Sequence, residues 1–409
     1  MDLPPPHDLP SVTVAPFDQH DPAFLADPYP TFAALRAGGE VHWHEEMGVA
    51  LAVSHAAASA VLRHRSLGRV WTDVAPVERF TGFNLLHRNS LLENEPPTHG
   101  RLRRLVAAAF GRGHVERLRP WISDLADELV DGLVAGIADH GQADLLTHVA
   151  APLPVEVIAE LLGVPAADRA LLQPWSNAIV KMYEYDLAPE KKDAAERAAT
   201  EFVAYLRDLV ALRRRSPGDD LVTDLVAVTD TDGGKLTEDE LVATAVLLLM
   251  AGHEATVNVI GNGVNALLTH PEQWQRLVAD QSLLSTAVEE LIRYDSPLQL
   301  FERTATERVE IAGHTVEPGH KIAALLGSAA RDPLVFDRPD TFDVGRTPNA
   351  HLGFGMGIHY CLGAPLARIE VQAALSALTR KLPTARLAAE PRRRAEFVIR
   401  GLRELPLTS

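Results

Sequence analysis

The feature that most constrains this chain is one long apolar helical segment, Leu236 to His270. It reads "LTEDELVATAVLLLMAGHEATVNVIGNGVNALLTH". Thr237 and Glu240 have the spacing of a capping box, and His270-Pro271 supplies a stop. A helix of about 34 residues is roughly 50 Å long at 1.5 Å per residue. We therefore predict a helix that runs through the centre of the fold.

The middle of this segment is unusual. Ala251 and Gly252 are small, and Glu254 follows in apolar surroundings. A buried carboxylate costs several kcal/mol unless it is paired or protonated. We therefore expect a cavity containing water beside Glu254. A helix kink packed against a neighbouring element is the alternative.

The rest of the chain predicts one mainly α domain with a small β portion. A chain of 409 residues with 46% hydrophobic content can bury a large core, and length alone allows two or three domains. Strands are expected within Val41–Ser54 and within Arg303–Leu326, while most other segments have a period of 3.6. We expect the domain to span residues 26–409, after an extended proline-rich segment at residues 1–25.

Composition excludes several functions. A formal charge of −16 argues against nonspecific binding to nucleic acid or anionic lipid. The first residues, "MDLPPPHDLP", resemble neither a signal peptide nor an anchor, and the apolar run Leu241–Gly252 is too short to cross a bilayer. A single cysteine forbids an internal disulfide and fits a reducing cytosol. We expect a cytoplasmic protein, with Arg213–Arg215 and Arg392–Arg394 as solvated patches.

The one cysteine, Cys361, lies in "HLGFGMGIHYCLGAPLAR". Glycines at 353, 355 and 357 permit positive φ and a close approach to something flat and bulky. A helix is predicted to begin just after the sulfur, where its dipole favours a thiolate. A lone soft ligand without a CxxC pair or a His/Cys cluster suits haem iron better than zinc.

Cys361 has two alternative roles. A lone cysteine is often a small core residue, but a core thiol needs no glycine-rich loop. It can also be a hydrolase nucleophile with His359 as its base, but no oxyanion geometry can be read from the sequence.

These segments together carry a family resemblance. "FGMGIHYCLG", Phe354 to Gly363, resembles the haem-binding signature of the cytochrome P450 haem-thiolate monooxygenases. Three more segments agree in order: "HGRLRRLVAAAF", "AGHEA" in the long helix, and "EELIR" with Glu290 and Arg293. The resemblance covers essentially the whole chain. It implies a single soluble bacterial domain with a long central helix and a proximal cysteine-ligand loop.

The resemblance also implies residue roles. Cys361 is expected to bind the iron of haem b (iron protoporphyrin IX) and to donate electron density to it, with Phe354 shielding the sulfur. The other expected cofactor-binding residues are Gly363 of the signature and four propionate ligands, His99, Arg103, Arg303 and His359. For His99 and Arg103, an exposed helix face is the alternative. Glu290, Arg293 and Arg346 are expected to form a buried structural ion cluster.

The catalytic positions depart from the family pattern. By resemblance they are Glu254, Ala255 and Thr256, but the family usually has an alcohol directly after the acidic residue, where this chain has Ala255. One residue turns a side chain by about 100°, so Thr256 cannot simply substitute. We hypothesise proton delivery through ordered water, Glu254 and a substrate hydroxyl or amide. Peroxide use or oxidative coupling is the alternative.

The implied reaction is hydroxylation or another oxidation of a lipophilic or aromatic small molecule with O2, in bacterial secondary or xenobiotic metabolism. The expected pocket is mainly apolar, and residues 177–196 are expected to form a lid of two helices joined by a charged loop. The pocket residues are Phe83, Leu85, Leu86, Val180, Leu247, Met250, Ala251, Leu298 and Leu300.

Electrons must come from another protein, because no flavin, dinucleotide or iron–sulfur motif is present. The resemblance implies a ferredoxin and a ferredoxin reductase, and a monomeric enzyme. Arg101, Arg104 and Arg112 are candidates to attract an acidic partner, or they are ordinary surface arginines. A non-catalytic haem sensor is a further alternative. The pair His42 and His44 in "HWHEE" is better explained by a surface strand than by a metal site.

Overall fold

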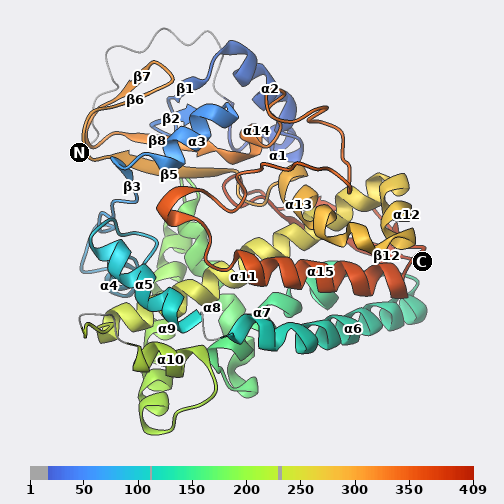
Figure 1. Ribbon diagram of the computed structural model, residues 1–409, viewed down its shortest axis with the longest axis horizontal. Helices are drawn as coiled ribbons and strands as arrows, with labels where there is room; N and C mark the ends of the chain where they lie inside the picture. Colours follow the sequence, from blue (N-terminus) through green and yellow to red (C-terminus); the bar gives the residue numbers. More distant parts are fainter. Residues whose placement is uncertain (1–16, 111–112, 229–232) are drawn as a thin grey trace.

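The computed structural model describes residues 17–110, 113–228 and 233–409. Helices dominate, and a small sheet lies at one end of the molecule (Figure 1). The predicted fold class, mainly α with a small β portion, is confirmed.

The helices occur in the following order. They are α1 (Pro22–Ala26), α2 (Tyr29–Gly38), α3 (His55–Arg63), α4 (Thr81–Arg88), α5 (Thr98–Phe110), α6 (His114–His140), α7 (Pro152–Leu162), α8 (Leu172–Val180), α9 (Pro189–Arg215), α10 (Leu221–Ala227), α11 (Glu238–Thr269), α12 (Pro271–Ala279), α13 (Leu284–Tyr294), α14 (Leu326–Ala329) and α15 (Ala364–Lys381). Shorter helical turns are η1 (Leu146–Ala150), η2 (Ala166–Leu171), η3 (Lys181–Tyr183), η4 (Gln281–Leu283) and η5 (Gly357–His359).

The main sheet has the order β1-β2-β8-β5-β3, in which only β2 and β8 run parallel. Its strands are β1 (Val41–His44), β2 (Val49–Ala52), β3 (Leu67–Gly68), β5 (Leu300–Ala305) and β8 (Lys321–Leu325). The smaller sheets are β4 (Ala143–Asp144), β12 (Pro406–Thr408) and β9 (Arg386–Leu387), the pair β6 (Val309–Ile311) and β7 (His314–Val316), and the pair β10 (Arg392–Arg393) and β11 (Leu402–Glu404). Both predicted strand regions are confirmed.

The long helix α11 crosses the middle of the molecule (Figure 1). Thr237 and Glu240 form the predicted capping box, and His270 is the C-cap residue. The helix packs against α4, α7, α8, α9, α13 and α15. Gly263 permits the contact with α13, since a Cβ there would lie 2.5 Å from the Leu291 side chain. A close approach of this kind explains how so many helices can pack around one central helix.

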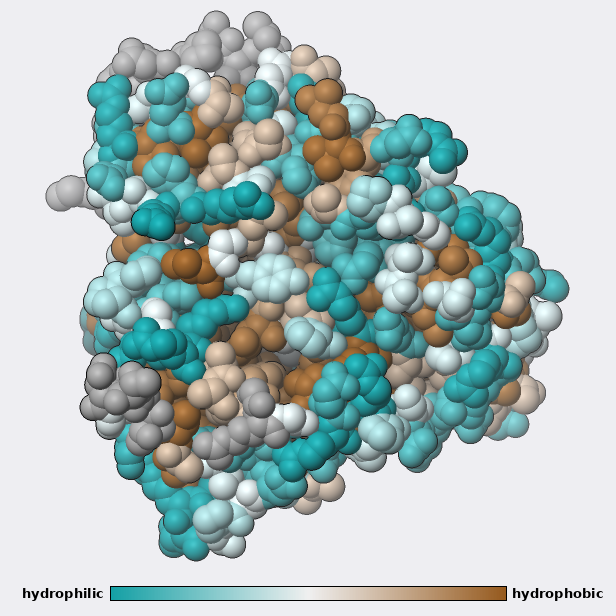
Figure 2. Space-filling model, in the orientation of Figure 1, coloured by the Kyte–Doolittle hydropathy of each residue, from teal (hydrophilic) through white to brown (hydrophobic). Residues whose placement is uncertain are grey.

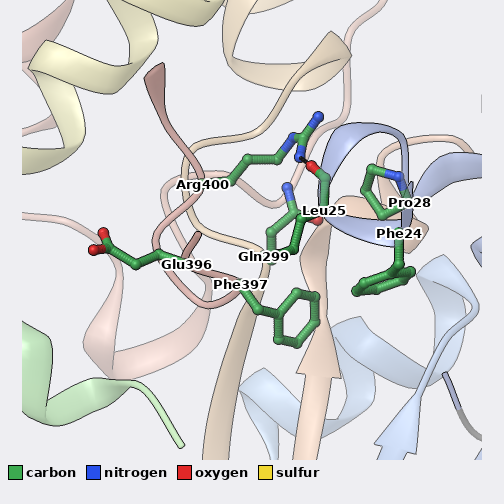
Figure 3. Close-up of a pocket in the computed structure, with 7 residues that line it drawn as sticks. All are labelled: Phe24, Leu25, Pro28, Gln299, Glu396, Phe397 and Arg400. Carbon is green, nitrogen blue, oxygen red and sulfur yellow. Dashed lines mark hydrogen bonds between the residues drawn. The ribbon is translucent and has the colours of Figure 1, made fainter. Parts of the chain in front are cut away.

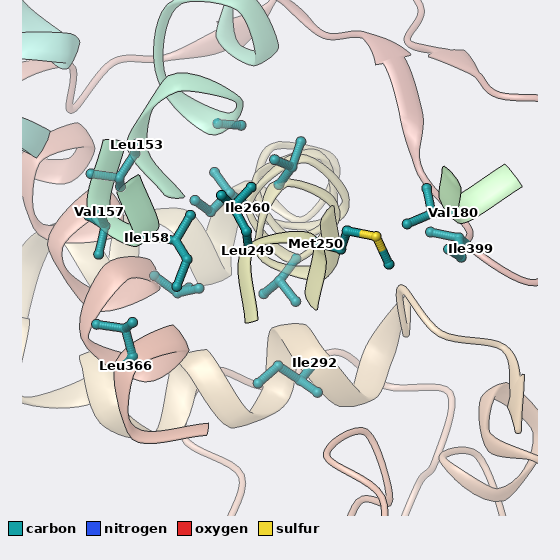
Figure 4. Packing of buried hydrophobic residues seen from close by; sticks show 14 of the residues in the cluster. Leu153, Val157, Ile158, Val180, Leu249, Met250, Ile260, Ile292, Leu366 and Ile399 are labelled. Carbon is teal, nitrogen blue, oxygen red and sulfur yellow. The ribbon is translucent and has the colours of Figure 1, made fainter. Parts of the chain in front are cut away.

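Among the described helices, α11 alone is long and apolar enough to span a bilayer, and 72% of its most apolar stretch is buried inside the protein. It belongs to one large apolar cluster that extends into α6, α7, α13 and α15. Figure 4 shows Leu153, Val157 and Ile158 beside Leu249 and Ile260 in this core. On the face shown in Figure 2, hydrophilic residues cover much of the surface and hydrophobic ones appear between them.

Three expectations need correction. Of the predicted extended segment at residues 1–25, residues 1–16 lie outside the described residues, and Pro22–Ala26 is helical because Asp21 caps it. His42 and His44 are buried rather than on a surface strand, and their rings bond to the carbonyls of Leu35 (2.7 Å) and Phe17 (2.8 Å).

The basic run at residues 392–394 is not a solvated patch. Arg393 pairs with buried Asp295 at 2.9 Å, and Arg394 pairs with Glu254 at 2.6 Å. At the other run, Arg213 pairs with Asp220. Long arginine side chains reach buried carboxylates here, which local composition does not reveal.

Candidate haem-thiolate site

One stripe of α11 is accessible although the helix lies in the core. Leu247, Leu248, Ala251, Gly252 and Ala255 are partly or fully accessible, whereas the residues between and around them are buried. Their spacing of three and four residues places them on one face of the helix. An accessible face on a central helix marks an internal space, and three of the five side chains that border it are small.

Ala255 and Thr256 lie on different sides of α11, as the helical rotation predicts. Ala255 is on the accessible stripe. Thr256 is 3% exposed and donates its hydroxyl hydrogen bond to the Gly252 carbonyl at 3.2 Å. Thr256 therefore does not present its hydroxyl to the space that Ala255 borders.

Glu254 is held by an ion pair with a distant residue, a partner that the local sequence does not predict. Its Oε1 lies 2.6 Å from Nη1 of Arg394, and Asn258 donates to the same oxygen at 3.4 Å. Arg394 is itself fixed by the carbonyl of Leu402 in β11. Pairing with Arg394 explains why a carboxylate is tolerated in this apolar helix.

The loop before α15 depends on three glycines for two different reasons. Gly355 and Gly357 have φ of 69° and 70°, the left-handed region that disfavours other residues. Gly353 does not have positive φ. It is needed because a Cβ there would lie 2.4 Å from the Ile292 side chain. The loop closes with a hydrogen bond from the Cys361 N–H to the Phe354 carbonyl at 2.9 Å.

Cys361 lies directly before α15, as predicted, and is exposed. Burial raises the pKa of its thiol, and this outweighs the hydrogen bonds from the backbone N–H groups of Gly363 and Ala364, which lower the pKa. The helix end therefore acts on the sulfur as expected, but its effect on the thiol pKa is smaller than that of burial. A side chain that is accessible yet closely surrounded lines an internal space, and metal coordination deprotonates such a thiol.

Three of the four expected propionate ligands, His99, His359 and Arg303, lie near Glu95, and the fourth, Arg103, lies near His99. The rings of His99 and His359 are 4.4 Å apart, and His359 Nε2 lies 2.7 Å from Glu95 Oε1. Arg103 of α5 donates to the Tyr360 carbonyl at 2.8 Å. Glu95 also attracts the charge of Arg303. His99 is 2% exposed, so the alternative of an exposed helix face is wrong for it.

The charges in this cluster leave room for an anion. Burial, followed by repulsion from Arg69, lowers the pKa of Arg303 to about 10. Among the described residues, Arg303 has no carboxylate within hydrogen-bond distance, because Arg69 takes Glu93. Burial and the neighbouring His359 lower the pKa of His99 to about 4, and His99 Nε2 is buried without a hydrogen-bond partner. An unpaired guanidinium and an unpartnered imidazole fit the carboxylates of a haem.

Glu290, Arg293 and Arg346 meet in one buried cluster. The Glu290 carboxylate accepts from Arg293 at 2.7 and 2.8 Å and from Arg346 at 3.1 Å. Asn349 and the backbone N–H of Asp343 add two more donors. The cluster joins α13 to the segment that precedes the cysteine loop.

The expected pocket residues divide into two groups. Leu85, Leu247, Ala251 and Leu298 are partly or fully accessible, and Phe83, Leu86, Val180, Met250 and Leu300 are buried in the surrounding wall. Figure 4 shows Met250 extending from α11 toward Val180 and Ile399. Ile399 and its neighbours also belong to the wall of the pocket. The sequence did not predict them, since no motif marks the C-terminal segment.

Residues 177–196 form the predicted pair of helices, the end of α8 and the start of α9. Their connection is tied to the C-terminal segment, because the Glu184 carboxylate accepts from the backbone N–H groups of residues 397–399 at 2.9 to 3.1 Å. Lys181 pairs with Glu396, and Tyr185 bonds to Glu302 of β5. These contacts form a latch that ties the segment to the C-terminal residues and to β5.

A small recess lies between α1 and the C-terminal segment (Figure 3). Figure 3 shows Arg400 bonded to the Leu25 carbonyl, with Phe24 and Phe397 nearby. None of the expected site residues lines this recess. It is a seam between the two ends of the described chain rather than part of the site.

The predicted basic docking residues differ from one another. Arg101 is paired with Glu240 and so is not free for a partner. Arg104 is exposed, and Arg112 lies outside the described residues. Exposed Ile358 and Tyr360 of the cysteine loop lie beside α3, since a Cβ on Gly357 would touch the Leu62 carbonyl. Among the described residues, no three His, Cys, Asp or Glu side chains cluster as a metal site.

The molecule is mainly helical, its central helix has an accessible stripe, and a glycine-rich loop surrounds its one thiol. These features together are those of the haem-thiolate class of proteins. The family model of cytochrome P450 matches residues 48–384. The chain belongs to the cytochrome P450 family, and it is a haem-dependent monooxygenase and thus an oxidoreductase.

Relatives agree over nearly the full length. The chain is 41% identical to cytochrome P450 monooxygenase PikC of Streptomyces venezuelae, with 94% of this chain and 91% of that protein covered. It is 38% identical to vitamin D(3) 25-hydroxylase of Pseudonocardia autotrophica, with 97% and 98% covered. The crystal structure of P450BioI in complex with an acyl carrier protein that carries hexadec-9Z-enoic acid matches with a TM-score of 0.88, at 34% identity and 95% and 99% coverage.

Proposed function

We propose that Cys361 binds the iron of haem b and that the accessible stripe of α11 borders the place where O2 and an organic substrate meet. The bound haem supplies the redox chemistry, in which O2, two electrons and two protons give one water and one oxygen atom inserted into a C–H or C=C bond. The observation that carries this proposal is the accessible lone thiol at the start of α15.

The roles of the other residues follow from charge. We propose that Arg103, Arg303, His99 and His359 bind the two propionates, because Arg303 lacks a carboxylate partner among the described residues and His99 has an unpartnered ring nitrogen. Phe354 shields the sulfur, and Gly363 lies beside it, since a Cβ on Gly363 would lie 4.0 Å from the Cys361 Sγ. Glu290, Arg293 and Arg346 hold the fold beneath the loop.

This site has no alcohol side chain at position 255 to deliver protons, because Ala255 stands there. Ala255 is on the accessible stripe, whereas the Thr256 hydroxyl points away from it. We propose that a hydroxyl or amide of the substrate, with ordered water, connects the site to Glu254. Arg394 neutralises Glu254 and holds it at the edge of the helix, where Arg394 remains 21% exposed to solvent.

The substrate is a lipophilic small molecule with at least one polar group. Apolar leucines and small residues border the accessible stripe, so shape and apolar contact dominate recognition. Two relatives are named for the compounds they hydroxylate, vitamin D(3) and 6-deoxyerythronolide B. These two molecules are the first to test here.

The electron donor is a small acidic ferredoxin served by its reductase, and the enzyme is a cytoplasmic monomer. The surface around the cysteine loop supports docking of a partner, because Ile358 and Tyr360 are exposed there. Basic residues are also exposed: Arg63 at the end of α3, Arg65 just after it, and Arg104 on α5. An apolar centre with basic neighbours suits a negatively charged partner.

Peroxide-driven oxidation or oxidative coupling is the second candidate, and Ala255 favours it. Such chemistry needs less proton delivery and tolerates the missing alcohol. Product formed with a ferredoxin system but not with hydrogen peroxide supports the monooxygenase; the reverse result supports the alternative.

The test is spectroscopic. Purified protein is expected to bind one haem, to give the carbon monoxide difference spectrum of thiolate-ligated iron when reduced, and to shift its visible absorption with compounds that bind. Cys361→Ser is expected to lose the thiolate spectrum. If the variant keeps it, Cys361 is not the ligand and the proposal is wrong.

A further inference from the structure

Phe354 is held on its ring face by a cation. The guanidinium of Arg368, on α15, lies 4.4 Å from the centre of the Phe354 ring. Arginine is attracted to an aromatic face by the ring quadrupole and stacks on it with its planar group. The backbone of Phe354 is fixed separately, by the hydrogen bond from the Cys361 N–H at 2.9 Å. The Phe354 ring is therefore held by Arg368, and the Phe354 backbone is held by the Cys361 N–H.

Arg368 is itself oriented by a carboxylate on another helix. Glu289 of α13 receives two parallel hydrogen bonds from Arg368, at 2.6 Å from Nε and 3.0 Å from Nη2. A bidentate pair fixes the plane of the guanidinium as well as its position. The two side chains are 33% and 25% exposed, so the geometry matters more than the strength of the ion pair.

A histidine on the cysteine loop completes the arrangement. The backbone N–H of Gly353 donates to Nδ1 of His351 at 3.1 Å. The ring proton therefore lies on Nε2, which is 3.0 Å from Glu289 Oε2 and donates to it. His351 also packs beside Phe354, with ring centres 5.9 Å apart. His351 of the loop thus helps to orient Glu289, which orients Arg368, which contacts the ring of Phe354 in the same loop.

We infer that Arg368, anchored by Glu289 and His351, is a positioning residue that fixes the Phe354 ring beside the Cys361 sulfur and so slows loss of the thiolate bond. The inference rests on the proposed role of Cys361 as iron ligand. A merely structural ion pair between α13 and α15 would not act through the Phe354 ring.

The experiment follows the reduced, carbon monoxide-bound holoenzyme in mild urea and measures the rate at which the thiolate-ligated spectrum disappears. Arg368→Gln is expected to increase this rate about two- to fivefold, the factor that corresponds to one partly exposed cation–π contact. Arg368→Lys is expected to increase the rate as well, since lysine lacks the planar guanidinium that stacks on the ring and binds the carboxylate with two hydrogen bonds. Arg380→Gln, on the same helix but paired with Asp127, is the matched control and is expected to leave the rate unchanged.

A double-mutant cycle decides between the two roles. In a Phe354→Leu background, Arg368→Gln is expected to add nothing to the rate. An equal increase in both backgrounds, or no increase in the Phe354-containing protein, overturns the inference. If Arg368→Gln does not fold, Glu289→Gln removes the anchor in its place and is judged by the same cycle. A wild-type protein without the thiolate spectrum would instead refute the proposed function.

Discussion

Replacing Glu290 with glutamine tests how much one buried carboxylate stabilises this fold. Glu290 and Arg293 are both 0% exposed, and Arg346 is 10% exposed. Glutamine keeps one acceptor oxygen but removes the charge and places an NH2 group against two guanidinium groups. Removing one partner of a buried ion pair costs about 3–5 kcal/mol. The arginines keep carbonyl acceptors, such as Ala330 for Arg293 at 2.9 Å, so we expect a loss within this range rather than twice it.

The assay is urea unfolding of the holoenzyme at pH 7, followed by far-ultraviolet circular dichroism. Asp127→Asn is the matched control, because it breaks the pair with Arg380 on the surface, where the side chains are 35% and 50% exposed. That change is expected to cost about 0–1 kcal/mol. If Glu290→Gln costs less than about 1 kcal/mol, the reasoning from burial and hydrogen bonding is refuted.

Three more outcomes follow from described contacts. Ala255→Thr is expected to raise the yield of product per electron consumed only for substrates that lack a suitably placed hydroxyl or amide; a rise with every substrate contradicts substrate assistance. Burial raises the pKa of Glu289, but hydrogen bonds from its arginine and histidine partners outweigh this and hold the pKa at about 2. The destabilisation by Glu289→Gln, measured in urea, should therefore be full near pH 7 and shrink below about pH 4.5; a constant difference contradicts it. Glu184→Gln weakens the latch over residues 397–399, so stopped-flow measurement should give faster binding of large inhibitors, and an unchanged rate argues against a lid.

Local sequence predicted the parts of this protein that local chemistry determines. The capping box at Thr237, the two strand regions, and the turn of Cys361 into α15 each depend on residues within a few positions. The rotation that separates Ala255 from Thr256 is also a property of any helix. These features need no knowledge of what packs against them.

The parts that were missed or wrong depend on distant contacts. Arg394 neutralises Glu254, the amides of residues 397–399 hold Glu184, and Glu95 organises the histidines near Arg303. Burial of His42 and His44 depends on carbonyls that alternation of residues cannot reveal. The pKa of the Cys361 thiol is raised because burial outweighs the hydrogen bonds at the helix end. In each case the deciding partner is supplied by the fold.

The ion pair between Glu254 and Arg394 has a consequence for biosynthesis. The two residues are 140 positions apart, and the ribosome makes the carboxylate first. Until the β10–β11 hairpin emerges and docks, the middle of the longest helix carries a charge without its counter-ion. Completion of the central helix is thereby coupled to the synthesis of a hairpin about 140 residues downstream, and a nascent chain stalled before that hairpin would lack this ion pair in its core.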